Sequence, residues 1–118
     1  MSESQTATVD LTTHVSATAL ALPLVLVADP NGSSRARRAG QLQARGFRVA
    51  PARTSFEAIV KAACLLPDLI LMDAALAEDA GGETPELLAT CPSTSHIPIV
   101  RLLAGRRVPP RVLARARC

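Results

Sequence analysis

The stretch Pro67-Asp68-Leu69-Ile70-Leu71-Met72-Asp73 decides the fold of this chain. It is a short apolar run that follows a proline and ends on a carboxylate. A run of this length between chain-breaking residues is typical of a strand buried on both faces of a parallel sheet. In open α/β sheets, ligands and chemistry gather outside the carboxyl ends of such strands, which makes Asp73 a candidate functional residue. The alternative is that Asp73 only ends the strand or caps the next loop.

Three further apolar runs alternate with helical patterns along the chain. Strands are predicted near residues 24–28, 47–50, 69–72 and 99–102, and helices over 34–45, 56–64, 85–89 and 111–117. This alternation predicts an α/β fold, a three-layer, doubly wound parallel sheet with strand order 2-1-3-4. In the helix over 34–45, Ala36, Ala39 and Leu42 form the expected apolar stripe, with the arginines on the opposite side.

Composition limits the classes of function. The 118 residues suggest one domain, and 48% hydrophobic residues are enough for a core. The formal net charge is +3, and arginines crowd the C-terminal end. Tyrosine and tryptophan are absent, which argues against base stacking and against nucleic acid as a partner. The arginine-rich end either contacts phosphate backbones or forms a solvated tail. The three cysteines lack C-x-x-C spacing, so neither a zinc site nor a disulfide framework is indicated, and free thiols in a reducing cytoplasm are expected.

The chain divides into three predicted parts. Residues 1–21 are rich in Ser, Thr and Ala and are expected to form a disordered N-terminal lead-in. They lack the basic start of a signal peptide, and Pro23 interrupts the apolar patch over 17–27, so no membrane span is predicted. Residues 22–105 form the folded domain, and residues 106–118 form a basic C-terminal tail or short helix.

Four segments, in order and at fitting spacing, resemble the receiver domain of bacterial two-component response regulators. They are Val25-Leu26-Val27-Ala28-Asp29, Gly46-Phe47-Arg48-Val49, the central stretch ending on Asp73, and Ile97-Pro98-Ile99-Val100. The resemblance covers roughly residues 22–104. It implies a flavodoxin-like receiver fold in a cytoplasmic phosphoprotein of a phosphorelay, which is not an enzyme and whose partner is a histidine kinase or another signalling protein.

The resemblance also implies a site. Asp73 would be the phosphoacceptor, attacking a phosphohistidine to form an acyl phosphate. Asp29, Asp73 and the backbone carbonyl of Ala75 would hold Mg²⁺, which offsets the repulsion between carboxylates and the phosphoryl group. No other cofactor is implied.

The sequence departs from the family at several of these positions. Pro30 stands where a second acidic residue is usual, so Mg²⁺ binding is expected to be weak. Leu103 occupies the switch position, where a hydroxyl normally binds the phosphoryl group. The only lysine, Lys61, falls on a helix, and the family's lysine has no counterpart. Arg106 or Arg107 could supply a substitute cation, although a guanidinium is not equivalent to an ammonium.

Two functions from different classes therefore stay open, beside a weaker nucleic-acid role for the arginine tail. One is phosphoryl acceptance at Asp73 with Mg²⁺. The other is a pseudo-receiver that binds a partner protein without phosphorylation. The sequence also lacks a clear fifth strand, which leaves the strand over 97–103 at an open edge. We expect Val108, Val112 and Leu113 to fold back over this edge, or a second copy to pair with it as a homodimer.

Overall fold

The computed structural model describes residues 22–78, 83–104 and 106–116. Its elements, in chain order, are β1 (Leu24–Ala28), α2 (Gly32–Gln43), β2 (Arg48–Ala52), α3 (Ser55–Leu65), β3 (Leu69–Asp73), α4 (Ala74–Ala77), α5 (Glu83–Thr90), β4 (Ile99–Leu102) and α6 (Pro110–Ala116). The predicted lead-in over residues 1–21 lies outside the described residues. No helix formed by the described residues is both long and apolar enough to span a membrane.

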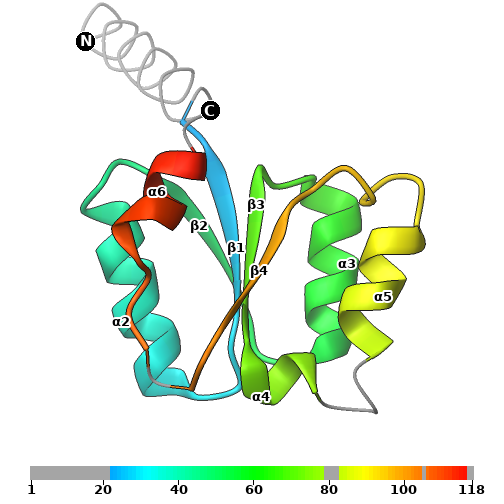
Figure 1. Ribbon diagram of the computed structural model, residues 1–118, viewed down its shortest axis with the longest axis horizontal. Coiled ribbons are helices and arrows are strands. Elements are labelled where there is room, and N and C mark those ends of the chain that lie inside the picture. Colours follow the sequence, from blue (N-terminus) through cyan, green and yellow to red (C-terminus); the bar gives the residue numbers. More distant parts are fainter. Residues whose placement is uncertain (1–21, 79–82, 105, 117–118) are drawn as a thin grey trace, which may run out of the picture.

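The four strands form one parallel sheet in the order β2-β1-β3-β4. Helices α2 and α6 cover one face and α3 and α5 cover the other, so the chain has three layers (Figure 1). The predicted α/β class, parallel direction and strand order are confirmed. The second strand lies slightly later than predicted, because β2 stays paired with β1 as far as the Ala28–Ala52 register position.

Alternate residues of the strands pack into two separate hydrophobic cores, one on each face of the sheet. Val25 and Val27 of β1 face the α2 side, whereas Leu26 and Ala28 face the α3 side. The central strand β3 is buried along its whole length. Because both faces of the sheet are covered, the strands are continuously apolar instead of alternating with polar residues.

The start of α2 is defined by a capping interaction. The side-chain oxygen of Asn31 accepts a hydrogen bond from the Ser34 backbone N–H at 3.0 Å, so the helix begins at Gly32, two residues earlier than predicted. After the helix, Gly46 adopts a φ of 89°, a left-handed conformation that glycine allows without strain. This turn reverses the direction of the chain, so that it enters β2 at Arg48.

The inward face of α2 differs from the predicted stripe. Its buried residues are Ser34, Arg38 and Leu42, which follow one another at intervals of four, whereas Ala36 is exposed. The assignment of every arginine to the solvent side is therefore wrong for Arg38, whose side chain is only 1% exposed. The physical reason for its burial lies at the carboxyl end of the sheet, where two carboxylates need a counter-charge.

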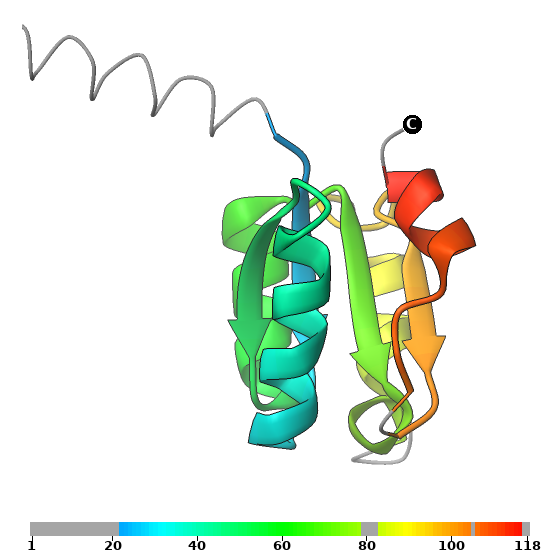
Figure 2. The same ribbon diagram turned by 90° about the vertical axis from the view of Figure 1, so that its left-hand side faces the viewer.

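After β4 the chain turns back along the α2 face of the sheet and ends in α6 (Figure 2). Val108 and Val112 are 1% and 6% exposed and belong to the core cluster that includes Leu71 and Leu102. These valines fold back onto the α2 face of the sheet, so the prediction that they cover the open edge of β4 is wrong for them. The side chain of Leu113 lies outside the described part of the chain. The described part of the chain has no strand after β4.

Candidate functional site

Two aspartates lie next to each other at the carboxyl edge of the sheet. Asp29 directly follows β1 and Asp73 is the last residue of β3, and these strands are neighbours in the sheet. The two residues are 0% and 3% exposed. Two carboxylates removed from water in this way require counter-charges or hydrogen-bond donors.

The counter-charge is Arg38. Its Nη1 lies 3.0 Å from Asp29 Oδ2 and 2.9 Å from Asp73 Oδ2, so a single guanidinium nitrogen bridges both carboxylates. Removing one member of such a buried cluster leaves an uncompensated charge. With two carboxylates and one guanidinium, the three side chains together carry one excess negative charge.

Neutral donors satisfy the remaining carboxylate oxygens. Asp29 Oδ1 accepts the Asn31 backbone N–H at 2.9 Å, and Asp29 Oδ2 also accepts the hydroxyl of Ser34. Asp73 Oδ1 accepts the backbone N–H of Ala75 at 2.9 Å, which caps the short helix α4. Every carboxylate oxygen of the pair therefore has a donor from the protein itself.

The other nitrogens of Arg38 reach the chain that follows β4. Nε donates to the carbonyl of Arg106 at 3.0 Å and Nη2 donates to the carbonyl of Leu103 at 2.9 Å. Next on the same helix, Gln41 donates to the carbonyl of Val108 at 2.7 Å and accepts the Val108 N–H at 2.9 Å. Through Arg38 and Gln41, helix α2 thus contacts both the acidic pair and the C-terminal segment that follows β4.

A pocket of about 380 Å³ opens beside the pair. Both aspartates line it, together with Pro30, Asn31, Ser33, Ser34, Arg37, Ala75 and Ala104. The structure therefore brings together Asp29, Asp73 and Ala75, the three residues that the resemblance assigned to metal binding.

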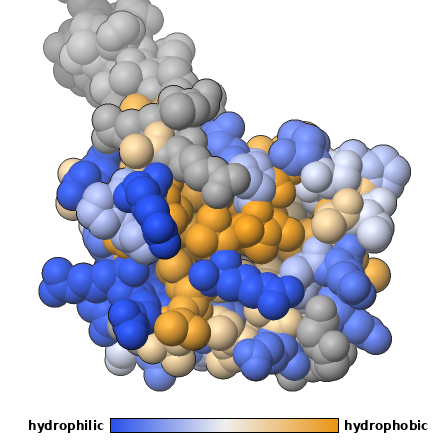
Figure 3. Space-filling view, viewed as in Figure 1, coloured by the Kyte–Doolittle hydropathy of each residue, from blue (hydrophilic) through white to orange (hydrophobic). Residues whose placement is uncertain are grey.

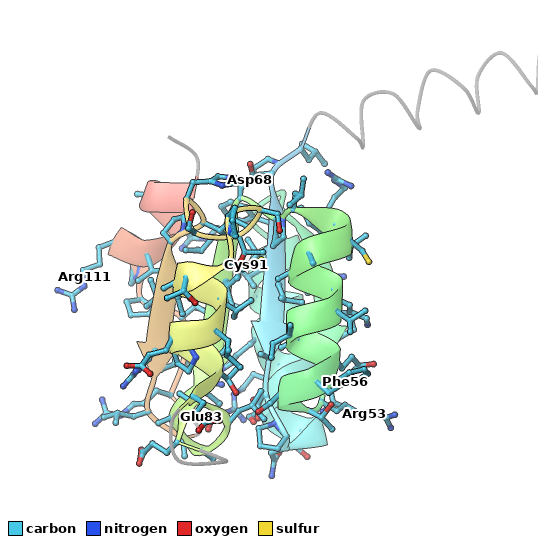
Figure 4. The ribbon with its side chains drawn as sticks, turned by 90° about the vertical axis from the view of Figure 1, so that its right-hand side faces the viewer. Arg53, Phe56, Asp68, Glu83, Cys91 and Arg111 are labelled. Atoms are coloured by element: carbon cyan, nitrogen blue, oxygen red, sulfur yellow. The ribbon has the colours of Figure 1, made fainter. Side chains whose placement is uncertain are left out.

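Helix α5 lies on the face of the sheet opposite α2. Its Glu83 lies near the end of the molecule at which the strands end (Figure 4).

The arrangement does not fit a resident magnesium ion. Mg²⁺ needs near-octahedral oxygen ligands at about 2 Å, usually including one or two carboxylates. Here one oxygen of each carboxylate is already engaged by the Arg38 guanidinium, which supplies a positive charge between them. Among the described residues, no group of three or more His, Cys, Asp or Glu side chains is placed to hold a metal.

The remaining residues singled out from the sequence lie apart from the carboxylates. Leu103 follows β4 with its side chain 62% exposed, and it reaches the site only through its carbonyl. Arg106 likewise contributes only a backbone carbonyl. Lys61 lies on α3, where it donates to the Pro51 carbonyl and lies 3.7 Å from Glu57. The substitute cation is Arg38, which the sequence analysis did not single out.

A signal for Arg38 is present in the sequence. Counting back from Leu42 in steps of four gives Arg38 and then Ser34, so all three share one helix face. That face meets the sheet at the end where both aspartates are expected. A polar inward face over a paired carboxylate site indicates a buried cation.

Comparisons with known proteins point to one family of folds. No protein-family model matches the chain, and no curated protein matches it in sequence. Among solved structures it is similar to the N-terminal domain of a response regulator receiver protein from Methanoculleus marisnigri, with 28% identity, a TM-score of 0.66, and coverage of 77% of this chain and 73% of that one.

Two further structures agree. The chemotaxis protein CheY4 of Vibrio cholerae is 25% identical, with a TM-score of 0.65 and coverage of 82% of this chain and 79% of that one. The receiver domain of HemR from Leptospira biflexa is 21% identical, with a TM-score of 0.60 and coverage of 76% and 71%, and shows the fold alone. From its strand order and these neighbours, we conclude that the chain has the fold of a response regulator receiver domain.

Proposed function

We propose that this receiver domain is a pseudo-receiver, a non-enzymatic cytoplasmic module that binds a signalling protein without accepting a phosphoryl group. A single observation carries the proposal. Arg38 Nη1 bridges Asp29 and Asp73 at hydrogen-bond distance, at the place where a phosphorylatable receiver needs a divalent cation. The partner would be a histidine kinase or another signalling protein, as for receiver domains in general.

The chemistry of phosphoryl transfer supports this proposal. Asp73 would have to attack phosphorus with a carboxylate oxygen that is free and accessible. Its Oδ2 is held by Arg38, its Oδ1 is held by the Ala75 N–H, and the residue is 3% exposed. A phosphoryl group on the Asp73 oxygen that contacts Arg38 would also break the bridge between Arg38 and Asp73.

The groups that stabilise a bound phosphoryl group in the family are also missing. Leu103 has no hydroxyl, and the one lysine of the chain lies on α3, paired with Glu57. Electrostatic stabilisation of the transferring group by metal and cationic side chains provides most of the catalysis in phosphoryl transfer. Arg38 alone does not replace these groups, because its single charge is already engaged by the two carboxylates.

The test is intact-mass measurement after incubation with acetyl phosphate and Mg²⁺. We expect no gain of a phosphoryl group in the wild-type chain, and no difference between it and the Asp73→Asn variant. A second measurement uses beryllofluoride with Mg²⁺, which mimics an aspartyl phosphate, and records amide NMR spectra. We expect the amide signal of Ala75 to stay in place. A mass gain that Asp73→Asn abolishes would show instead that the site accepts phosphoryl groups.

A further inference from the structure

Helix α3 carries apolar side chains on two opposite faces. Its inner face packs Ala58 and Ala62 against the sheet, where both are fully buried. Its outer face carries Phe56, Val60 and Cys64, which follow one another at intervals of four and so form one line along the helix. Phe56 is 78% exposed, Val60 is 42% exposed, and Cys64 is exposed as well. We call this line the α3 stripe; a helix that is apolar on both faces is normally covered on both.

The two charged side chains of α3 lie beside the α3 stripe and not on it. Glu57 and Lys61 each follow a stripe residue by one position, a step that turns by about 100° around a helix. Lys61 Nζ lies 3.7 Å from Glu57 and donates to the carbonyl of Pro51, a residue of the edge strand β2. The charges are therefore directed toward β2, which leaves the stripe itself apolar.

Exposed apolar surface continues from the stripe to the point where the chain enters the sheet. Leu65 and Leu66, at the C-terminal end of α3, are 48% and 52% exposed. Two residues later, the Asp68 N–H donates to the Leu24 carbonyl, and the Asp68 carboxylate accepts the Leu24 N–H, both at 2.8 Å. The C-terminal end of α3 therefore lies beside the start of β1, with Leu22, 39% exposed, at the entry.

The 21 residues that precede Leu22 are long enough to follow the stripe. At about 1.5 Å per residue, a helix of 11 residues such as α3 is about 16 Å long, whereas 21 residues reach about 30 Å in the same conformation. The covalent link through Leu22 also holds this segment near the domain, at an effective concentration on the order of millimolar. The segment therefore competes for the stripe more effectively than a separate chain of the same sequence.

The apolar residues of this segment have the same spacing as the stripe. The step from Leu11 to Val15 equals the step from Phe56 to Val60, and Leu22 falls on the same helix face as Leu11 and Val15. Since Leu22 lies at the C-terminal end of α3, a helix that leads into it runs parallel to α3. In that arrangement Leu11 lies beside Phe56, and Val15 lies beside Val60.

The charges of the segment and the domain are opposite. Residues 1–21 contain Glu3 and Asp10 and no lysine or arginine, so they carry a charge of −2. All 13 lysines and arginines lie in the rest of the chain together with eight of the 10 acidic residues, which gives that part a charge of +5. Arg53 is exposed just before the N-terminal end of α3 (Figure 4). In the parallel arrangement, Asp10 reaches this end of the helix.

A second apolar area of the surface lies over β4, in the middle of Figure 3. Leu103, which directly follows β4, is 62% exposed. Strand β3 separates β4 from β1, whereas α3 packs directly against β1. A segment that enters at the start of β1 therefore meets the α3 stripe first, and the β4 area serves as the comparison in the experiment.

We propose that residues 1–21 form a helix that packs parallel to α3 on the α3 stripe, instead of the disordered lead-in that their composition predicts. Burial of the apolar stripe drives the contact, and the opposite charges of segment and domain favour it. The segment closes the stripe to other proteins for as long as it stays in place. This inference does not depend on whether Asp73 accepts a phosphoryl group.

Disulfide cross-linking within the full-length chain tests the register. In a chain whose three native cysteines are replaced by alanine, Val15→Cys is combined either with Val60→Cys or with Leu103→Cys. We expect a disulfide within one chain for the combination with Val60→Cys only, because these two positions lie within disulfide range in the proposed packing. Non-reducing electrophoresis and intact mass detect it. Equal cross-linking of both combinations, no cross-linking, or disulfides between two chains would overturn the proposal.

The reactivity of Cys64 tests the cover in the otherwise native chain. The variant Leu11→Asp, Val15→Asp places charge on the packed face of the segment, and the matched control Thr13→Asp, Ser16→Asp places the same charge on its other side. We expect iodoacetamide to modify Cys64 several-fold faster in the first variant than in the wild type, and at the wild-type rate in the control. The other exposed cysteine of the described residues is the internal reference. A Cys64 rate that both variants raise equally, or that neither raises, would refute the cover.

Discussion

Arg38 and Asp73 form a buried ion pair across 35 positions of the chain, with Nη1 and Oδ2 2.9 Å apart and both side chains nearly inaccessible to water. The same nitrogen lies 3.0 Å from Asp29 Oδ2. One guanidinium therefore serves both carboxylates and, through its other nitrogens, two carbonyls beyond β4. One side chain thus links the acidic site to the C-terminal segment.

Replacing Arg38 should destabilise the protein strongly. Arg38→Leu leaves Asp29 and Asp73 buried without their counter-charge, which we expect to lower the free energy of unfolding by about 3–5 kcal/mol. Arg111→Leu on α6 is the matched control, because Arg111 is exposed and points away from the protein (Figure 4); such surface changes are usually within about 0.5 kcal/mol. Urea unfolding of both variants measures the difference. Equal midpoints would mean that the bridge contributes little to stability.

Magnesium should distinguish the wild type from a chain without the bridge. In Arg38→Ala the two carboxylates lose the guanidinium and become available to a divalent cation, so Mg²⁺ should raise the melting temperature of this variant. We expect little or no effect of Mg²⁺ on the wild type. The double variant Arg38→Ala, Asp73→Asn should lose the response. A large Mg²⁺ stabilisation of the wild type would show that the ion displaces Arg38.

The contact between Gln41 and Val108 should anchor the returning segment. Gln41→Ala leaves both the N–H and the carbonyl of Val108 without their side-chain partner, at an expected cost of about 1–3 kcal/mol. Gln43→Ala is the matched control, since Gln43 lies exposed on the same helix. Amide hydrogen exchange should be faster at Val108 in the first variant only. Unchanged exchange at Val108 would mean that packing alone holds the segment.

The two exposed cysteines of the described chain should differ in reactivity. A hydrogen bond between the Cys91 Sγ and the Ser93 hydroxyl, 3.3 Å apart, lowers the pKa of Cys91 below its usual value. More of Cys91 is therefore thiolate at neutral pH, and the thiolate is the form that reacts. Iodoacetamide labelling followed by peptide mass mapping should modify Cys91 faster than Cys64, and Ser93→Ala should reduce the difference. Equal rates in the wild type would contradict this expectation.

Much of the fold could be predicted because its signals are local. The apolar runs, the breakers between them and the helix caps act within a few residues, and they predicted the strand order and the positions of β1 and β4 without error. The position of Asp29 next to Asp73 also followed, because each ends a strand and the two strands were expected to be neighbours. The ends of the elements were predicted less accurately, as at β2, where pairing with β1 extends the strand to Ala52.

The site depended on tertiary structure. The residue types alone predicted two carboxylates at one sheet edge and the lack of the family's lysine and hydroxyl. They did not predict which arginine would neutralise the pair, because any of several arginines near the edge has the right charge. Packing of α2 against the sheet determines that this arginine is Arg38, because it turns the face with Ser34, Arg38 and Leu42 inward. Desolvation of the two carboxylates then made a buried guanidinium favourable, an effect that exists only once distant segments of the chain are brought together.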